Sequence, residues 1–256
     1  MDINTKSFLG REEPLLTVMA QADNPDRIEE LMKRSIPEGA EAFGMQFCRM
    51  KPEYRTEETY RRLFVHTEGR PTYVTNYRHA YNKEKSDETL AEELLTLAKS
   101  GATLCDVMAD MFDRQKGEFT TDPLAVKKQT ELAERLHQSG AQVLMSSHIL
   151  EFTPAKRVLE IALEQERRGA DICKIVTGAK SMPEQIENLR IITLLKEKLS
   201  VPFLFLSGGE SRILRRIGGE IGCCMYLCVY EYDDLATKSQ PLLSDMVKIR
   251  ELMRAK

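Results

Sequence analysis

The sequence has little excess charge of either sign, no long apolar run and no closely paired cysteine motif. Its 37 lysines and arginines stand against 40 aspartates and glutamates, which gives a formal net charge of -3. This balance argues against a nucleic-acid-binding protein, because no surplus of cations is present to neutralise phosphates. The apolar runs fall far short of the roughly 20 residues that span a bilayer. The first residues, MDINTKSFLGREEP, contain no apolar segment of a secretory signal. We therefore expect a cytoplasmic protein that binds neither nucleic acid nor membrane.

The six cysteines are not spaced like metal ligands. No two of them form a C-x-x-C pair, the usual spacing of a zinc knuckle. Most lie in apolar, strand-like runs, where a free cysteine behaves as a small hydrophobic residue. We expect buried, reduced thiols and no metal or cofactor at Cys48, Cys105, Cys173, Cys223, Cys224 and Cys228.

Short apolar runs with the character of strands recur along the whole chain. The distance from each run to the next leaves room for one helix and two loops, which is typical of a parallel sheet. Most of these runs are apolar throughout rather than alternating, which favours a sheet covered on both faces. The predicted strands are Leu15–Met19, Ala42–Phe47, Thr72–Asn76, Thr103–Met108, Gln142–Ser146, Ile172–Val176, Phe203–Leu206 and Cys224–Val229.

The segments between these runs carry signals for the start and end of helices. Ser86–Ser100 begins with a serine and acidic residues and ends at Gly101, so the capping residues agree with the helix dipole. Further helices are predicted over Pro25–Ser35, Asp122–Ser139, Pro154–Arg168 and Pro183–Leu199. Eight strand–helix steps predict an α/β protein with a (β/α)8 TIM barrel, in which residues 1–256 form a single domain. An open doubly wound sheet is the alternative, but no G-x-G-x-x-G motif follows the first strand.

Two side chains stand where a barrel displays its reactive groups. Lys174 lies inside the apolar strand ADICKIV, where an ammonium group is costly unless it is paired or neutralised. Burial favours the neutral amine, which is the form that attacks a carbonyl to make a Schiff base. His148 closes the preceding strand in VLMSSHIL. Since neighbouring strands lie about 4.8 Å apart, both side chains are expected to meet at the mouth of the barrel. A structural lysine and a surface histidine are the alternatives.

Two arginines and one glutamine follow other strands. Arg78 lies in TNYRH after the third strand, and Arg216 lies in SGGESRILRR after the seventh. Guanidinium groups at the barrel mouth suggest a substrate carboxylate or phosphate, although most arginines are solvated surface charges. Gln240, in TKSQP beyond the last strand, could complete such a site. The glycine pair Gly208–Gly209 permits close approach of the backbone to an anion.

Several segments together resemble the type I 3-dehydroquinate dehydratase family. SSHILEFTP and GADICKIV resemble its histidine and Schiff-base lysine segments, and further similarity is found in PEGAEAFGMQF, VTNYR and GATLCDVM. The resemblance implies a TIM barrel, commonly a homodimer, that acts in the shikimate pathway without metal or diffusible cofactor. It implies that Lys174 forms the imine and that His148 moves the protons. It also implies that Arg216 and Gln240 hold the substrate carboxylate, with Arg78 at the polar side of the ring.

The sequence departs from the family at several motif positions. Where the family has glutamate, arginine and aspartate on its second strand, this chain has Gly44, Gln46 and Cys48. Gln46 is the amide among them, and we assign it to substrate binding. Ala236 replaces a serine. These losses remove groups that read ring hydroxyls, so the substrate is expected to be 3-dehydroquinate or a related cyclic keto acid.

A further departure concerns the partner of the histidine. In the fourth-strand segment, where the family has a glutamate that helps to orient the catalytic histidine, this chain has Met108. A thioether is only a weak hydrogen-bond acceptor. We therefore expect a hydroxyl, a backbone carbonyl or water to hold His148. Asp106 and Asp110 are candidates to replace the missing charges.

Three functions fit these residues. The first is a Schiff-base lyase that dehydrates the cyclic keto acid. The second is a class I aldolase that uses the same lysine on an open-chain keto acid. The third is a non-catalytic protein that keeps the barrel and binds a related ligand, since the lost charges are what decay of activity would leave behind.

Overall fold

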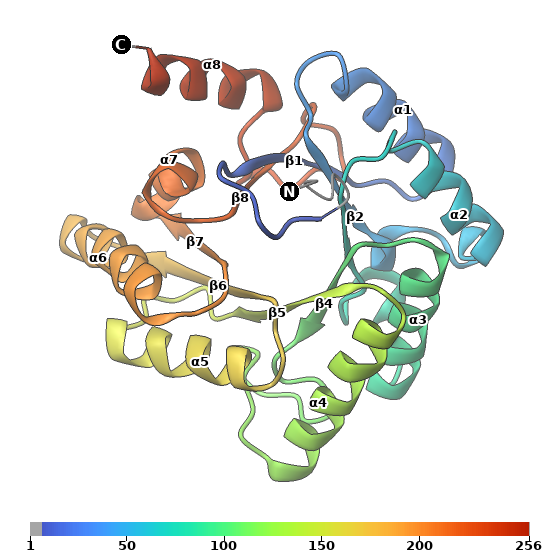
Figure 1. Ribbon diagram of the computed structural model, residues 1–256, viewed down its shortest axis with the longest axis horizontal. Helices are drawn as coiled ribbons and strands as arrows, with labels where there is room; N and C mark the ends of the chain where they lie inside the picture. Colours follow the sequence, from blue (N-terminus) through green and yellow to red (C-terminus); the bar gives the residue numbers. More distant parts are fainter. Residues whose placement is uncertain (1–6, 256) are drawn as a thin grey trace. The chain divides into compact units, whose positions relative to one another are not determined.

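The computed structural model describes residues 7–255, and in them strands and helices alternate in the order of a (β/α)8 barrel (Figure 1). The predicted α/β fold class is confirmed. The strands are β1 (Leu15–Ala20), β2 (Ala42–Gln46), β3 (Thr72–Thr75), β4 (Leu104–Met108), β5 (Gln142–His148), β6 (Ile172–Ala179), β7 (Phe203–Gly209) and β8 (Met225–Cys228). The α-helices are α1 (Pro25–Ser35), α2 (Glu57–Val65), α3 (Asp87–Ser100), α4 (Pro123–Gln138), α5 (Ala155–Arg167), α6 (Met182–Lys198), α7 (Leu214–Ile221) and α8 (Leu243–Arg254). Short 3₁₀ turns are η1 (Phe47–Arg49), η2 (Pro52–Tyr54), η3 (Ala80–Asn82) and η4 (Glu210–Ile213).

The chain divides into two compact units, each with its own part of the sheet. The first unit comprises residues 1–105, 139–141 and 225–256, and its strands pair in parallel in the order β8, β1, β2, β3 and the start of β4. The second comprises residues 106–138 and 142–224, in which β5, β6 and β7 pair in parallel. That the chain forms one domain stays a prediction, and its outermost residues lie outside those described.

The helix signals in the sequence place α1, α3, α4, α5 and α6 to within about one residue at each end. Asn24 caps α1 by accepting a hydrogen bond from the Arg27 backbone N–H at 3.0 Å, and Ser86 caps α3 in the same way through Thr89. The glycine that ends α3, Gly101, has a φ of 122°, a conformation that other residues rarely adopt. The apolar sides of these helices pack against the strands, as the buried Leu90, Leu94 and Leu97 of α3 do.

Two predictions, one about the cysteines and one about membrane-spanning helices, can be compared with the structure. No disulfide joins the cysteines of residues 7–255, and five of the six are buried, as expected for cysteines in apolar runs. Burial raises the pKa of the Cys173 thiol and of the Cys223 thiol to about 12. Over residues 7–255, each helix is too short or too polar to cross a bilayer.

Candidate active site

Lys174 lies in the middle of β6 and is almost completely buried, with 4% of its surface exposed. Its Nζ donates a hydrogen bond to Oδ2 of Asp106 on β4 at 3.2 Å. The other oxygen of this carboxylate, Oδ1, accepts a 2.5 Å hydrogen bond from the Ser146 hydroxyl on β5. Asp106 and Ser146 are buried too. A buried ammonium is thus neutralised by a buried carboxylate, which satisfies the requirement that the sequence imposed on this lysine.

Strand register places Lys174 and His148 on the same side of the sheet. Ser146 lies opposite Lys174 in the β5–β6 ladder, and His148 follows two residues later, opposite Val176. Side chains two residues apart on a strand share a face. The intervening Ser147 points the other way, because its hydroxyl accepts a hydrogen bond from Gln165 of α5. The lysine and the histidine therefore lie on the face of the sheet turned away from α5.

The partner of His148 is a carboxylate, which corrects the prediction of a hydroxyl, carbonyl or water. Nδ1 of His148 lies 2.6 Å from Oε2 of Glu118, which belongs to the loop between β4 and α4. Met108 does not provide this contact. The carboxylate accepts a hydrogen bond from the Nδ1 side of the ring, and this leaves Nε2 as the nitrogen that can accept a proton.

The backbone at Glu118 is held in an uncommon conformation. Glu118 has a φ of 50° and follows Gly117, whose φ is 82°. Residues other than glycine seldom adopt positive φ, because this conformation costs about 1–3 kcal/mol. It persists only where the surrounding structure holds it in place. The backbone carbonyl of Glu118 also accepts a hydrogen bond from the Ser147 hydroxyl at 2.8 Å. The loop thus fixes both the backbone and the carboxylate of Glu118 against the end of β5.

Arg168, directly after α5, anchors the same loop. Its guanidinium is fully buried and donates hydrogen bonds to the carbonyls of Ala109 at 3.0 Å and Thr120 at 2.6 Å, on either side of Glu118. Gln129 of α4 accepts a third hydrogen bond at 2.8 Å. A single side chain therefore connects both ends of the loop to α4 and α5.

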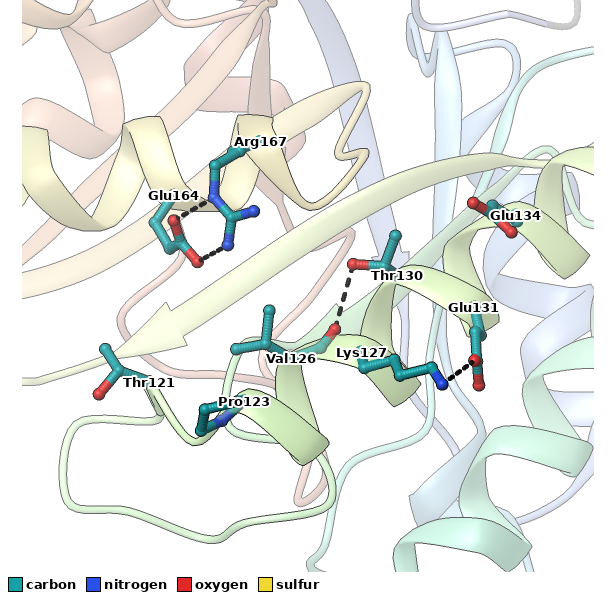
Figure 2. Close-up of a pocket in the computed structure, with 9 residues that line it drawn as sticks. All are labelled: Thr121, Pro123, Val126, Lys127, Thr130, Glu131, Glu134, Glu164 and Arg167. Carbon is teal, nitrogen blue, oxygen red and sulfur yellow. Dashed lines mark hydrogen bonds and ion pairs between the residues drawn. The ribbon is translucent and has the colours of Figure 1, made fainter.

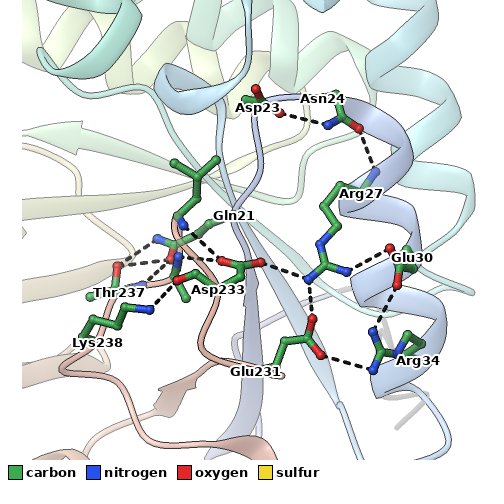
Figure 3. A network of polar contacts seen from close by, with 12 residues as sticks. Gln21, Asp23, Asn24, Arg27, Glu30, Arg34, Glu231, Asp233, Thr237 and Lys238 are labelled. Carbon is green, nitrogen blue, oxygen red and sulfur yellow. Dashed lines mark hydrogen bonds and ion pairs between the residues drawn. The ribbon is translucent and has the colours of Figure 1, made fainter.

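In the first unit, Gln46 belongs to a cluster of neutral polar side chains. It lies at the end of β2, where its Oε1 accepts a hydrogen bond from the Gln21 amide that follows β1. Gln21 also contacts Thr237, accepting a hydrogen bond from its backbone N–H at 2.8 Å (Figure 3). Amide groups both donate and accept, so this cluster can bind hydroxyl or carbonyl groups but supplies no charge.

Gln240 lies on the loop between β8 and α8, whose fold is fixed by ion pairs to α1. Arg27 bridges Asp233 and Glu231 of this loop, and Asp233 in turn accepts a hydrogen bond from the backbone N–H of Ala236 (Figure 3). Gln240 is 6% exposed, and its buried side-chain oxygen has no hydrogen-bond partner among residues 7–255. An unsatisfied amide oxygen of this kind is costly, so its position is consistent with a ligand-binding group.

Arg78 holds a protein carboxylate. Its Nε donates a hydrogen bond to Oδ1 of Asp87, in the first turn of α3, and its Nη2 donates one to Oδ2. Both distances are 2.7 Å, so the two side chains form a bidentate ion pair. Only 12% of its side chain is exposed. A role for Arg78 in substrate binding stays a prediction.

The second-strand positions that lack the family's charges are closely packed. A Cβ atom at Gly44 would lie 2.1 Å from the sulfur of Met19, which fills the space beside β2 together with Tyr73. Cys48 lies in η1 rather than on a strand, and its sulfur is 3.6 Å from the His79 ring. The space beside Gly44 is therefore occupied by the Met19 thioether, which would have to move to admit a larger residue at position 44.

Arg216 lies on α7, close after β7, beside an open pocket of about 500 Å³. The pocket is lined by Glu210, Arg212, Ile213 and Arg216. The glycines at the end of β7 differ from each other: a Cβ at Gly209 would lie 2.2 Å from the Ala179 carbonyl, whereas Gly208 faces open space. Gly209 is thus required by the β6–β7 connection rather than by an anion.

A second, larger pocket of about 640 Å³ lies between α4 and α5 (Figure 2). Its charged groups include ion pairs, Arg167 with Glu164 at 2.6 Å and Lys127 with Glu131 at 3.8 Å. None of the predicted site residues lines it. In the part of the chain that the structure describes, no three His, Cys, Asp or Glu side chains come together as metal ligands would.

Comparison with known proteins identifies the family to which the chain is similar. The model of the type I 3-dehydroquinase family matches residues 57–255. A 3-dehydroquinate dehydratase of Listeria monocytogenes is 28% identical over 137 residues, which are 53% of this chain and 50% of that protein. A catabolic 3-dehydroquinate dehydratase of Acinetobacter baylyi is 33% identical over 101 residues, covering 39% of this chain and 36% of that protein. The chain thus spans half or less of the length of these relatives.

Solved structures with the same fold cover nearly the whole chain. A 3-dehydroquinate dehydratase from Geobacillus kaustophilus has a TM-score of 0.80 at 14% identity and covers 96% of this chain and 93% of that one. The type I enzyme from Clostridium difficile, solved with covalently modified comenic acid, has the same TM-score and identity and covers 95% and 94%. At this identity the likeness shows the fold alone.

Proposed function

Because the chain belongs to the type I 3-dehydroquinase family, we propose that it is a Schiff-base lyase that dehydrates 3-dehydroquinate or a related cyclic keto acid. The observation that carries this proposal is that Lys174 and His148 lie on one face of the sheet and that each is paired with a carboxylate. Lys174 is paired with Asp106, and His148 is paired with Glu118. An amine nucleophile and an oriented imidazole base are the two groups that imine-based dehydration requires.

In the proposed reaction, Lys174 transfers a proton to Asp106 and its neutral amine attacks the ketone of the substrate. Loss of water from the adduct gives an iminium ion, which acidifies the neighbouring C–H bond. Nε2 of His148 removes this proton, with the resulting imidazolium stabilised by Glu118. The imidazolium then donates the proton to the departing hydroxyl group, which leaves as water. Hydrolysis of the imine releases the enone acid and restores Lys174.

The anionic end of the substrate is assigned to Arg216, which stands at the family's arginine position and makes no ion pair or hydrogen bond in the structure. Gln46 and Gln240 are assigned to the substrate as well, on the basis of the resemblance. Their neutral amides fit the loss of charge on β2, and this is why a related keto acid is included beside 3-dehydroquinate itself.

The experiment that tests the proposal is reduction with borohydride in the presence of saturating 3-dehydroquinate. We expect a mass adduct on Lys174 and, without borohydride, growth of enone absorbance. Lys174→Ala protein is the control and should give neither signal. Lys174 that stays unmodified would contradict the covalent mechanism, and release of pyruvate without enone would indicate an aldolase.

A further inference from the structure

Three arginines lie on one helical turn directly after β7. Arg212 is in η4, and Arg215 and Arg216 are in the first turn of α7, which continues from it. Positions three and four apart in a helix lie side by side, about 5–6 Å between Cβ atoms. Arg212 therefore neighbours both of the others. We refer to these three residues as the arginine turn.

No side chain in the described structure neutralises the arginine turn. None of the three guanidinium groups makes a hydrogen bond or ion pair to residues 7–255. Nε of Arg215 is buried without a partner, and burial lowers the pKa of this group, since no nearby carboxylate offsets the loss of water. Glu210 lines a pocket together with Arg212 and Arg216, and it forms no ion pair with the arginine turn within residues 7–255. Three neighbouring cations without a counter-charge repel one another, and this arrangement is unfavourable unless an anion binds.

Several other arginines of the second unit are paired. Arg167 in the pocket between α4 and α5 binds Glu164, Arg190 on α6 binds Glu187, and the buried Arg168 binds Glu164 and two carbonyls. The arginine turn differs from these three arginines, whereas Arg114, on the loop after β4, likewise makes no hydrogen bond or ion pair to residues 7–255. The arginine turn begins at the end of β7, so it lies at the carboxyl edge of the strands that carry Lys174 and His148.

We propose that the arginine turn binds a second oxyanion of the substrate, a phosphate or a second carboxylate, beside the carboxylate assigned to Arg216. This inference rests on the proposed function and narrows it, because it makes the natural substrate a keto acid with two anionic groups. Arg212 and Arg215 bind the second group, and a bidentate guanidinium contact is the usual way in which such oxyanions are held.

The anion site can be tested without turnover. Thermal unfolding is followed in sodium chloride, and then with inorganic phosphate or malonate at the same ionic strength. At about ten times the dissociation constant, we expect one of these anions to raise the midpoint of the wild-type protein by about 3 °C. The rise should be lost in Arg212→Met and Arg215→Met and kept in Arg167→Met, the control. A larger effect of phosphate indicates a phosphorylated substrate, and a larger effect of malonate indicates a dicarboxylate.

The same variants separate this proposal from the proposed function. Lys174→Ala protein should keep the response to the anion. With 3-dehydroquinate as substrate, Arg216→Met should raise KM at least tenfold, whereas the control Arg167→Met should leave it within about twofold. The inference is overturned if neither anion stabilises the wild-type protein, or if Arg215→Met responds as the wild type does. It is also overturned if Arg215→Met raises KM as much as Arg216→Met, because Arg215 would then belong to the first carboxylate.

Discussion

At the scale of single residues, the contact between Glu118 and Nδ1 of His148 assigns the role of base to the other ring nitrogen, Nε2. Glu118→Gln removes the negative charge but keeps an oxygen that can accept a hydrogen bond from Nδ1. We expect kcat to fall about 10- to 100-fold and KM to stay within about twofold, because the imidazolium loses its counter-charge. Steady-state kinetics with 3-dehydroquinate measure both constants. Glu151→Gln, at an exposed residue paired with Lys116, is the matched control. An unchanged kcat in Glu118→Gln would show that this contact has no part in the reaction.

The buried pair of Lys174 and Asp106 has a consequence for stability. Asp106→Asn leaves an ammonium group without its carboxylate, and we expect the free energy of unfolding to fall by about 3–5 kcal/mol. Combining it with Lys174→Met should recover most of this loss, since both charges are then absent. Urea denaturation of the two single variants and the double variant gives the coupling. Strictly additive losses would mean that the two groups do not interact.

The reactive pair of this site could be predicted from the sequence, but its supporting groups could not. Lys174 stands out because a cation is rare inside an apolar strand, and His148 because it closes the strand before it. Glu118 gives no such signal, because its reach depends on the positive φ at Gly117 and Glu118 and on the anchor at Arg168. Asp106 was named only as one of two candidates to replace missing charges, and the structure pairs it with the lysine.

At the scale of secondary structure elements, the end of β7 shows two adjacent glycines with different functions. Gly209 has a φ of 62°, and its missing Cβ makes room for the Ala179 carbonyl of β6, whereas Gly208 has free space. Gly209→Ala should lower the free energy of unfolding by about 1–3 kcal/mol or more, and Gly208→Ala by less than about 1 kcal/mol. Chemical denaturation of both variants tests this. Equal losses would contradict the close approach of β6 and β7.

Most elements follow from local signals in the sequence. The helices α1, α3 and α6 have a capping side chain at their first turn, and the strands were found to within a few residues because their runs are apolar. The predicted second strand continued to Phe47, whereas β2 ends at Gln46 and η1 begins at Phe47. An apolar residue in a buried 3₁₀ turn resembles the last residue of a strand, so spacing alone cannot separate them. The sequence signals predict no helix over α2, α7 or α8, and the eight residues of α7 include two glycines.

At the scale of the whole molecule, buried thiols make stability depend on alkaline pH. Burial raises the pKa of Cys173 and of Cys223 from 9.0 to about 12, so the unfolded chain releases these protons first. Their contribution is fully present below pH 9 and is lost as pH rises from 9 to 12, by about 1.4 kcal/mol per pH unit for each thiol. Urea denaturation between pH 9 and 11 should show a shallower decline when both residues are changed to alanine. An unchanged slope would contradict the pKa shift.

The class of fold could be predicted from the sequence because the sequence repeats one local pattern, an apolar run followed by a helix. Eight apolar runs separated by capped helices fit few other topologies. Within each unit the order of strands follows the order along the chain, except that β8 lies beside β1. The homodimer and the cytoplasmic location stay predictions, since they depend on surfaces and surroundings that neither the strand pattern nor a single chain contains.

The loop held by Arg168 should open under milder denaturing conditions than those that unfold the strands. Opening this loop breaks fewer hydrogen bonds and exposes less apolar surface than unfolding of the strands does, so it requires less free energy. His148 would then lose its carboxylate while β5 and β6 remain paired. In rising denaturant or temperature, enzymatic competence should therefore disappear before the circular dichroism of the fold changes. The chain would pass through an inert but folded state, whose population is set by one buried guanidinium.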